Sequence, residues 1–268
     1  MKIGIILPTF TEEADLPFET ALAAEEAALD GIFTYDHIWP IGYPDRPAVS
    51  AAAVLGILTQ TTKIIRLGTL VARVGLLPDN LLMAEMKTLN SLSGNRMIAG
   101  IGTGDKKSIL ENTVLHVPEV SVKKRQESLS KVAAALADSG METWIGAGLD
   151  STNRVAFSVG AKLNFWNLTP EALEKKISFC TKSLSPGDAL GAATAGFEDG
   201  ASVLREDPAI KAEDFTWAGQ LPRANRERLS LHGALQSLGI SWAVFHLGSN
   251  QKKELTDAVS FLAELPKE

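Results

Sequence analysis

The sequence predicts an α/β protein with the fold of a (β/α)8 barrel, and three observations support this. Short apolar runs, rich in β-branched residues, alternate along the chain with longer segments of helical periodicity. The apolar runs are continuously hydrophobic, as parallel strands covered by helices must be. The length of 268 residues suits one barrel, since this fold typically fills about 250 residues. We therefore expect a single barrel domain over residues 1–268, with short insertions.

The expected elements follow one another in strand–helix order. Strands are predicted at Ile3–Leu7, Ile32–Tyr35, Ile64–Val71, Met97–Gly102, Thr143–Ala147, Leu163–Trp166, Phe215–Ala218 and Ile240–Leu247. Helices are predicted at Pro17–Leu29, where proline lies in the first turn, and at 48–60 and 78–91. Three more helices follow from apolar stripes at i, i+3, i+4 and i+7, which begin at Leu129, Leu231 and Leu255. Residues 184–213 show no period, and we expect an irregular excursion there.

Composition excludes several classes of protein. The chain has 26 basic and 32 acidic residues, a net charge of −6, which argues against nucleic-acid binding because such proteins carry a basic face. A single cysteine, Cys180, allows no internal disulfide and no multi-cysteine metal site, so we expect buried filler there and no metal. No stretch reaches the roughly 20 apolar residues of a membrane helix, and no targeting segment is evident. We expect a soluble, cytoplasmic protein without a membrane partner.

Polar, aromatic and glycine residues gather where several predicted strands end. The second strand runs into Tyr35–Pro40, the fourth ends in Gly100–Asp105, and the fifth ends in Gly146–Gly148. Catalytic groups of a (β/α)8 barrel come from the carboxyl ends of its strands. The sequence therefore predicts the functional site at this rim.

His37 is the strongest catalytic candidate among the four histidines. A lone histidine is more often a hydrogen-bonded structural residue than a catalyst, and that alternative stays open. Its place directly after a strand, between Asp36 and Trp39, favours proton transfer, because an unperturbed imidazole titrates near neutral pH. Of the other histidines, only His246 at the end of the eighth strand can also reach the rim.

Two glycine-rich strand ends have more than one reading. The run Gly100-x-Gly102-x-Gly104 is neither the dinucleotide G-x-G-x-x-G motif nor a Walker A loop, which leaves a close-packed strand end as the simpler alternative. The stretch Gly146–Gly148, followed by Ser151 and Thr152, suits a phosphate at a helix N-terminus. An ordinary strand–helix turn capped by Ser or Thr explains it equally well.

Five segments have the order and spacing of a known family: Gly4–Pro8, Ala27–His37, Ile65–Val71, Leu89–Arg96 and Gly104–Asp105. They resemble the bacterial luciferase-like flavin superfamily, most closely its actinobacterial coenzyme F420-dependent oxidoreductases. The resemblance covers residues 1–170 throughout, and beyond them only Thr216–Gly219 and the eighth strand are similar.

This resemblance implies a TIM barrel with a deazaflavin or flavin at the carboxyl rim. The family's strand-three cis peptide, which supports the cofactor ring, corresponds to the bond between Leu70 and Val71. Its strand-two histidine corresponds to His37, with Trp39 facing the substrate, and its strand-four acid, often Glu, corresponds to the shorter Asp105. Asn90 and Asn95 replace the Asp and Gly of many members.

The implied cofactor-binding residues include the phosphate loop at Gly148, Ser151 and Thr152. The full set is Asp36, Thr69, Leu70, Val71, Gly104, Ala147, Gly148, Ser151, Thr152 and Trp166. Because F420 is polyanionic and the chain is acidic, compensating charge is expected locally, from Arg73, Lys106 and Lys107 or from the phosphate-binding helix end.

The leading hypothesis is hydride transfer between coenzyme F420 and a small organic substrate. His37 is expected to orient or protonate the substrate, and Asp105 to act as acid or base. Trp39 is expected to form a wall of the substrate pocket. The alternatives are an FMN-dependent luciferase-like monooxygenase that uses oxygen, or a non-catalytic flavin-binding barrel. By analogy with the family, we expect a homodimer.

Overall fold

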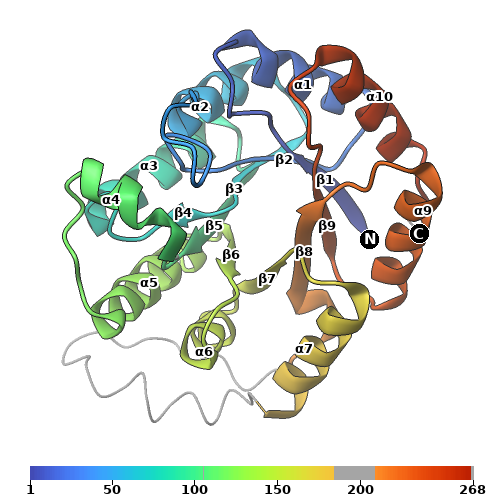
Figure 1. The fold of residues 1–268 in the computed structure, drawn as a ribbon. Coiled ribbons are helices and arrows are strands. Elements are labelled where there is room, and N and C mark those ends of the chain that lie inside the picture. The colour runs from blue at the N-terminus through green and yellow to red at the C-terminus, as the bar shows by residue number, and fades with distance from the viewer. Residues whose placement is uncertain (105, 184–208, 267–268) are drawn as a thin grey trace.

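The strands form a closed parallel barrel surrounded by helices (Figure 1). The computed structural model describes residues 1–104, 106–183 and 209–266. The strand order is β3-β2-β1-β9-β8-β7-β6-β5-β4, and β3 also pairs with β5, which closes the sheet. Every neighbouring pair is parallel. The predicted (β/α)8 barrel is confirmed.

The observed strands lie close to the predicted ones. They are β1 (Lys2–Ile6), β2 (Gly31–Thr34), β3 (Arg66–Thr69), β4 (Ala72–Arg73), β5 (Met97–Gly102), β6 (Glu142–Gly146), β7 (Lys162–Trp166), β8 (Phe215–Gln220) and β9 (Trp242–His246). Both β3 and β4 pair with β5, and residues 70–71 separate them, so together they fill one position in the barrel. The nine strands of the described residues therefore build a barrel with eight positions.

The helices cover the outside of the barrel. They are α1 (Asp15–Glu26), α2 (Ala51–Thr61), α3 (Asp79–Leu92), α4 (Ile109–Val114), α5 (Val122–Ala137), α6 (Asp150–Ser158), α7 (Pro170–Ser183), α9 (Asn225–Ser237) and α10 (Lys252–Ala263), with short 3-10 turns η1 (Lys106–Ser108) and η3 (Ala212–Asp214). The first helix ends before the predicted Leu29 because Ala28 adopts a positive φ of 56°. The second begins at Ala51 because the Ser50 hydroxyl accepts from the N–H of Ala53. Of the predicted excursion 184–213, residues 184–208 lie outside the described ranges.

The third strand begins later than predicted, because the first backbone N–H groups of the predicted strand donate to a carboxylate on α1. Oε1 of Glu25 accepts from the backbone N–H groups of Lys63, Ile64 and Ile65 at 2.8, 2.8 and 3.0 Å. These donors are therefore lost to the sheet, and β3 starts at Arg66.

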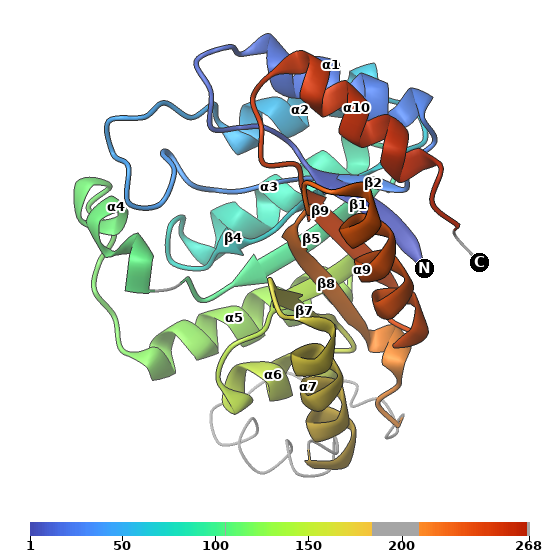
Figure 2. The same cartoon turned by 45° about the vertical axis from the view of Figure 1, so that its right-hand side comes forward.

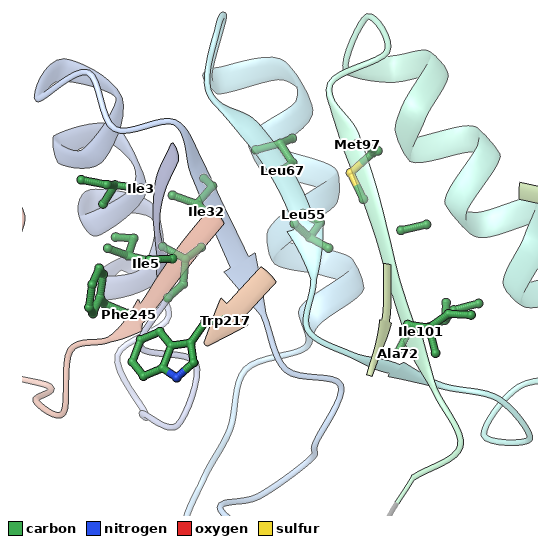
Figure 3. Packing of buried hydrophobic residues seen from close by; sticks show 14 of the residues in the cluster. Ile3, Ile5, Ile32, Leu55, Leu67, Ala72, Met97, Ile101, Trp217 and Phe245 are labelled. Atoms are coloured by element: carbon green, nitrogen blue, oxygen red, sulfur yellow. The ribbon is translucent and has the colours of Figure 1, made fainter. Parts of the chain in front are cut away.

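Two apolar layers pack the barrel. Inside it, the rings of Phe33, Trp144 and Trp242 contact one another at centroid distances of 5.0–5.8 Å. Outside it, strand residues pack against the helices, as Figure 3 shows for Ile32 and Leu67 on neighbouring strands with Leu55 of α2. The interior is thus a filled core rather than a channel, which leaves the strand ends as the place for a site.

Arg96, directly before β5, ties the amino-terminal end of the barrel together. Its Nε donates to the Ser93 carbonyl at 2.7 Å. Its Nη1 donates to the Thr62 hydroxyl and the Ile65 carbonyl, and its Nη2 donates to the carbonyls of Thr59 and Thr62, all within 3.1 Å. Five contacts match the five N–H donors of a guanidinium, so every donor of Arg96 has a partner.

No helix within the described ranges combines the length and the apolar character that a membrane crossing requires.

Candidate functional site at the carboxyl rim

At the carboxyl ends of the strands, a chain of charged side chains joins the loop after β2, the end of β4 and helix α4. The Asp36 carboxylate, after β2, accepts from the backbone N–H of Arg73 at 2.7 Å and from its Nε at 2.9 Å. Nη1 of Arg73 lies 2.7 Å from Oε2 of Glu111 on α4. The same oxygen lies 2.7 Å from Nδ1 of His37, and Oε1 of Glu111 accepts from the N–H of Ile38 at 2.5 Å. Figure 2 shows α4 and the loop after β2 on the same side of the barrel.

This network fixes the orientation of His37. Glu111 is only 2% exposed, and burial raises the pKa of its carboxyl. The hydrogen bonds from His37 and Ile38 and the charge of Arg73 outweigh burial, so the net pKa of Glu111 lies below its usual value. An ionised carboxylate only accepts hydrogen bonds, and Nδ1 of His37 must therefore donate. The other ring nitrogen, Nε2, remains for chemistry, as in other carboxylate-oriented histidines.

Arg73 retains unused donor capacity although it is 5% exposed. Its Nη1 also donates to the Asn112 amide oxygen at 3.1 Å, but its buried Nη2 has no hydrogen-bond partner among the described residues. A buried unpaired donor is unfavourable. The guanidinium therefore combines a structural role toward Asp36 and Glu111 with capacity for one more acceptor.

Tyr35 lies at the centre of an aromatic cluster over the mouth of the barrel. Its ring stacks on Phe10 at 5.4 Å between centroids and meets the edge of Trp166 at 6.0 Å. The rings of His37 and His246 lie 6.4 and 6.1 Å from it. Burial raises the pKa of the Tyr35 phenol, which keeps it protonated. The two histidines from opposite parts of the chain are therefore held beside one planar, uncharged surface.

The backbone between β3 and β4 approaches β5 closely. The peptide bond between Leu70 and Val71 is cis, as the resemblance implied. A Cβ on Gly100 would lie 1.9 Å from the Thr69 carbonyl oxygen, and one on Gly102 would lie 2.7 Å from Cγ2 of Val71. Glycine is thus required at both positions, which supports the reading of the glycine run as a close-packed strand end.

The remaining predicted residues of this region have structural partners. The Thr69 hydroxyl donates to the Gly100 carbonyl at 2.7 Å, and Leu70 packs inside the barrel with Val71 beside it. Gly104 has a φ of 73°, and its ideal Cβ would lie 3.3 Å from Cδ of Arg73.

The predicted phosphate loop lies between β6 and α6. The N–H of Gly148 donates to the Asn153 side chain at 3.1 Å, and the Ser151 hydroxyl accepts from Gln126. Thr152 is buried. No side chain caps the start of α6. The first backbone N–H groups of this helix therefore suit an anionic group better than the side chains of Ser151 and Thr152 do.

The other predicted residues lie at the same rim with fewer contacts. Ala147 follows β6 and donates its N–H to the Asn164 carbonyl at 2.7 Å. Trp39 is half-buried in the loop after β2. The predicted acid Asp105 lies outside the described residues. Within the described ranges, no cluster of three or more His, Cys, Asp or Glu side chains could hold a metal ion.

Sequence reasoning did not identify Glu111 or Tyr35 as candidate site residues. Glu111 lies on α4 among exposed apolar side chains such as Ile109 and Leu110. An acid in such a stretch is a usable signal, but only the folded contact with His37 shows its purpose.

The fold and rim define this molecule as a (β/α)8 barrel with a candidate active site at the carboxyl ends of its strands. Residues 1–129 match the model of the luciferase-like monooxygenase family. The amino-terminal part of the chain is therefore similar to luciferase-like monooxygenases. No curated protein is significantly similar in sequence.

Solved structures with the same fold are distant in sequence. An F420-dependent secondary alcohol dehydrogenase in complex with an F420-acetone adduct is 12% identical, covers 98% of this chain and 97% of its own, and has a TM-score of 0.73. Monooxygenase RslO1 from Streptomyces bottropensis is 14% identical over 98% of both chains, with a TM-score of 0.70. The third structure is the oxygenating constituent of 3,6-diketocamphane monooxygenase from Pseudomonas putida in complex with FMN. It is 13% identical, covers 88% of this chain and 73% of its own, and has a TM-score of 0.60.

Proposed function

We propose that this protein is an oxidoreductase that transfers a hydride between coenzyme F420 and a small organic substrate. The observation that carries the proposal is the pair of His37 and Glu111 at the mouth of the barrel, which holds an imidazole in one tautomer. Hydride transfer to a carbonyl, or from an alcohol, needs a group that gives or takes a proton. The F420-dependent alcohol dehydrogenase of the same fold supports the choice of cofactor.

Each part of the rim has a role in this proposal. F420, when bound, supplies the carbon that takes or gives the hydride. The uncapped start of α6 would hold its phosphate, and the bulge at Leu70–Val71 would support its ring. Arg73, whose Nη2 has no hydrogen-bond partner among the described residues, would help to balance its negative charge. His37 would hold the transferred proton on Nε2 while Glu111 stabilises the charged ring.

FMN with molecular oxygen is the second candidate. It is favoured by the match of residues 1–129 to the luciferase-like monooxygenase family model and by the FMN complex of the 3,6-diketocamphane enzyme. The same residues at the rim would hold either cofactor, because both present a planar ring and a phosphate. A binding test therefore has to separate the two.

Cofactor titration tests the proposal directly. The chain has five tryptophans, and Trp166 lies at the rim, so quenching of their fluorescence reports occupancy. We expect saturable quenching by F420 at lower concentration than by FMN. Tight FMN binding with no response to F420 overturns the choice of cofactor. Tight F420 binding without turnover on any alcohol or ketone assigns the protein to the non-catalytic flavin binders instead.

We also propose that the protein forms a homodimer through the outer helices. Exposed apolar side chains lie on these helices, including Ile57 on α2 and both Leu81 and Leu92 on α3. Helices α2 and α3 pack against each other, and exposed apolar side chains on neighbouring helices favour a protein interface. Light scattering after size-exclusion chromatography is expected to give twice the mass of 28.6 kDa, and a monomer mass contradicts this.

A further inference from the structure

Helix α4 has the reverse of the usual burial pattern. Of its six residues, all within the described ranges, only Glu111 is buried. The apolar side chains of Ile109, Leu110 and Val114 are 61%, 52% and 54% exposed, whereas a surface helix normally buries an apolar stripe and exposes its charges. In Figures 1 and 2, α4 lies at the left edge of the molecule. The hydrophobic effect therefore contributes little to holding this helix on the barrel.

Polar contacts hold α4 in place instead. Within the described ranges, its hydrogen bonds to other elements come from two neighbouring side chains. Glu111 accepts from His37 and Ile38 and pairs with Arg73, and the Asn112 amide oxygen accepts from Nη1 of Arg73 at 3.1 Å. The partners lie in the loop after β2 and at the end of β4. The helix is thus attached to the barrel through the same network that orients His37.

Loops connect α4 to the barrel on both sides. Gly104, before it, has a φ of 73°, in the left-handed region that favours glycine. Residues 118–121, between α4 and α5, are exposed or half-buried. A helix with few buried apolar contacts opens locally at a low cost in free energy. Loop residues absorb the change in backbone angles when such a segment moves.

Opening of α4 would carry Glu111 away from His37. Nδ1 of His37 would then lose the carboxylate that accepts from it, so the ring could adopt either neutral tautomer. The large apolar side chains of α4 are exposed already, so the cost of opening lies in the hydrogen bonds and the ion pair. The contacts that close the helix over the rim are therefore also the contacts that orient the imidazole.

We propose that Glu111 and Asn112 make α4 a polar clamp, which opens and closes over the rim and assembles the pair of His37 and Glu111 when it closes. Asn112 is a positioning residue, because it binds Arg73 beside Glu111 and, within the described ranges, has no hydrogen bond to His37. The inference rests on the proposed function in one respect: His37 handles the transferred proton. Closure then links the admission of ligands to the assembly of the acid–base group.

Hydrogen exchange of the full chain without cofactor, followed by mass spectrometry, tests the clamp. A released helix of six residues is too short to stay folded alone. Opening therefore exposes its amides, and also the N–H groups of Leu115 and Val117, which donate to the carbonyls of Glu111 and Asn112. In Asn112→Ala, we expect exchange over residues 109–117 to be about tenfold faster than in wild type, the scale of one hydrogen bond to a charged group. Exchange over α5 should stay unchanged.

Leu110→Ala is the matched control on the same helix. It removes an exposed apolar side chain and introduces a strong helix former, so exchange over residues 109–117 should stay at the wild-type rate. Glu111→Asp is a second release variant, which retains the charge but shortens its reach by one methylene. It is expected to accelerate exchange over the same residues, and it keeps the test conclusive if Asn112→Ala fails to fold.

The 15N signals of the His37 ring test whether closure assembles the pair. Asn112→Ala retains both His37 and Glu111. We nevertheless expect the ring to change from one tautomer with Nδ1 protonated to a mixture, because α4 is open for a larger share of the time. An asparagine that only stabilises the helix would leave these signals as in wild type.

The inference is overturned if both release variants exchange at the wild-type rate over residues 109–117, or if Leu110→Ala accelerates exchange equally. It is also overturned if His37 keeps one tautomer while α4 exchanges faster. Both measurements are made without cofactor, which separates them from the proposed function. Faster exchange and mixed tautomers in a chain that does not bind F420 overturn the proposed cofactor alone. Binding and turnover of F420 with wild-type exchange in both release variants overturn the clamp alone.

Discussion

The two ends of the barrel use arginines in opposite ways. At the amino-terminal end, Arg96 donates only to carbonyls and hydroxyls of its own fold, and all five N–H donors are satisfied. At the carboxyl end, Arg73 lies between two carboxylates, and its Nη2 has no partner within the described ranges. The same side chain completes the structure at one end and leaves binding capacity at the other. A functional site is expected at the end of the barrel where buried hydrogen-bonding groups lack partners.

Replacing His37 with Asn should produce the largest effect, on activity and not on folding. The amide retains a polar group but cannot hold a proton at neutral pH. We expect steady-state turnover with F420 to fall about 100- to 10,000-fold, the usual contribution of general acid–base catalysis. Cofactor affinity and thermal midpoint should stay near wild type. His116→Asn is the control, and unchanged turnover in His37→Asn removes this residue from the mechanism.

Replacing Arg96 with Met should affect stability instead. The substitution leaves the carbonyls of Thr59, Thr62 and Ile65 without their donor. We expect a loss of about 3 kcal/mol in the free energy of unfolding, and a decrease in Tm of roughly 6–12 °C by calorimetry. The exposed Arg226, changed to Met, is the matched control. Equal Tm values for both variants would contradict the contrast between the two ends.

Replacing Glu111 with Gln tests whether the carboxylate positions His37. The Gln side chain has a similar size, but its amide group also donates hydrogen bonds, so it does not fix one tautomer of His37. We expect turnover to fall about tenfold, as for other partners that orient a histidine. The 15N signals of His37 should change from one tautomer with Nδ1 protonated to a mixture. A wild-type tautomer with reduced turnover contradicts a positioning role.

The same variant has a defined pH signature. A carboxyl whose pKa is lower in the folded than in the unfolded state adds stability above its unfolded pKa of about 4.3. That contribution is lost as pH falls through the lower folded value. Because the pKa of Glu111 is lowered on folding, the difference in unfolding free energy between wild type and Glu111→Gln should shrink as pH decreases below about 4. Urea unfolding at several pH values measures this.

Replacing Asp150 with Asn should have the smallest effect. Asp150 places a carboxylate in the first turn of α6, where the proposed phosphate would bind. Removing its charge should tighten F420 binding by about two- to threefold at low salt, with the gain lost at high salt because the group is exposed. Tryptophan quenching at two salt concentrations measures it, and equal affinities contradict a phosphate at this helix.

The sequence predicted the barrel well because strands and helices are encoded locally. The strand Met97–Gly102 has the predicted bounds, and the stripe Leu129, Val132, Ala133 and Leu136 is wholly buried on α5. Boundaries differed where a distant side chain took part, as when Glu25 on α1 delayed the start of β3. Resemblance also anticipated the cis bond at Leu70–Val71, which periodicity does not encode.

The site was only partly predictable. His37 and Asp36 follow a strand, so their position made them candidates, but Glu111, which holds His37, lies 74 residues away on a six-residue helix. Similarly, Gln220 reaches His246 only because β8 and β9 pair in register. Local pattern carries no information about such pairs.

The sequence by itself determined the alternation of strands and helices and the rim on which polar residues gather, because periodicity and turn chemistry act over a few residues. Only the tertiary structure decided which of these residues are partners. Closure of the barrel brings Arg73, Glu111 and His37 together in one network. It also sets Thr9 beside His246 in one hollow. These contacts join residues distant along the chain, and packing alone determines their distances and burial.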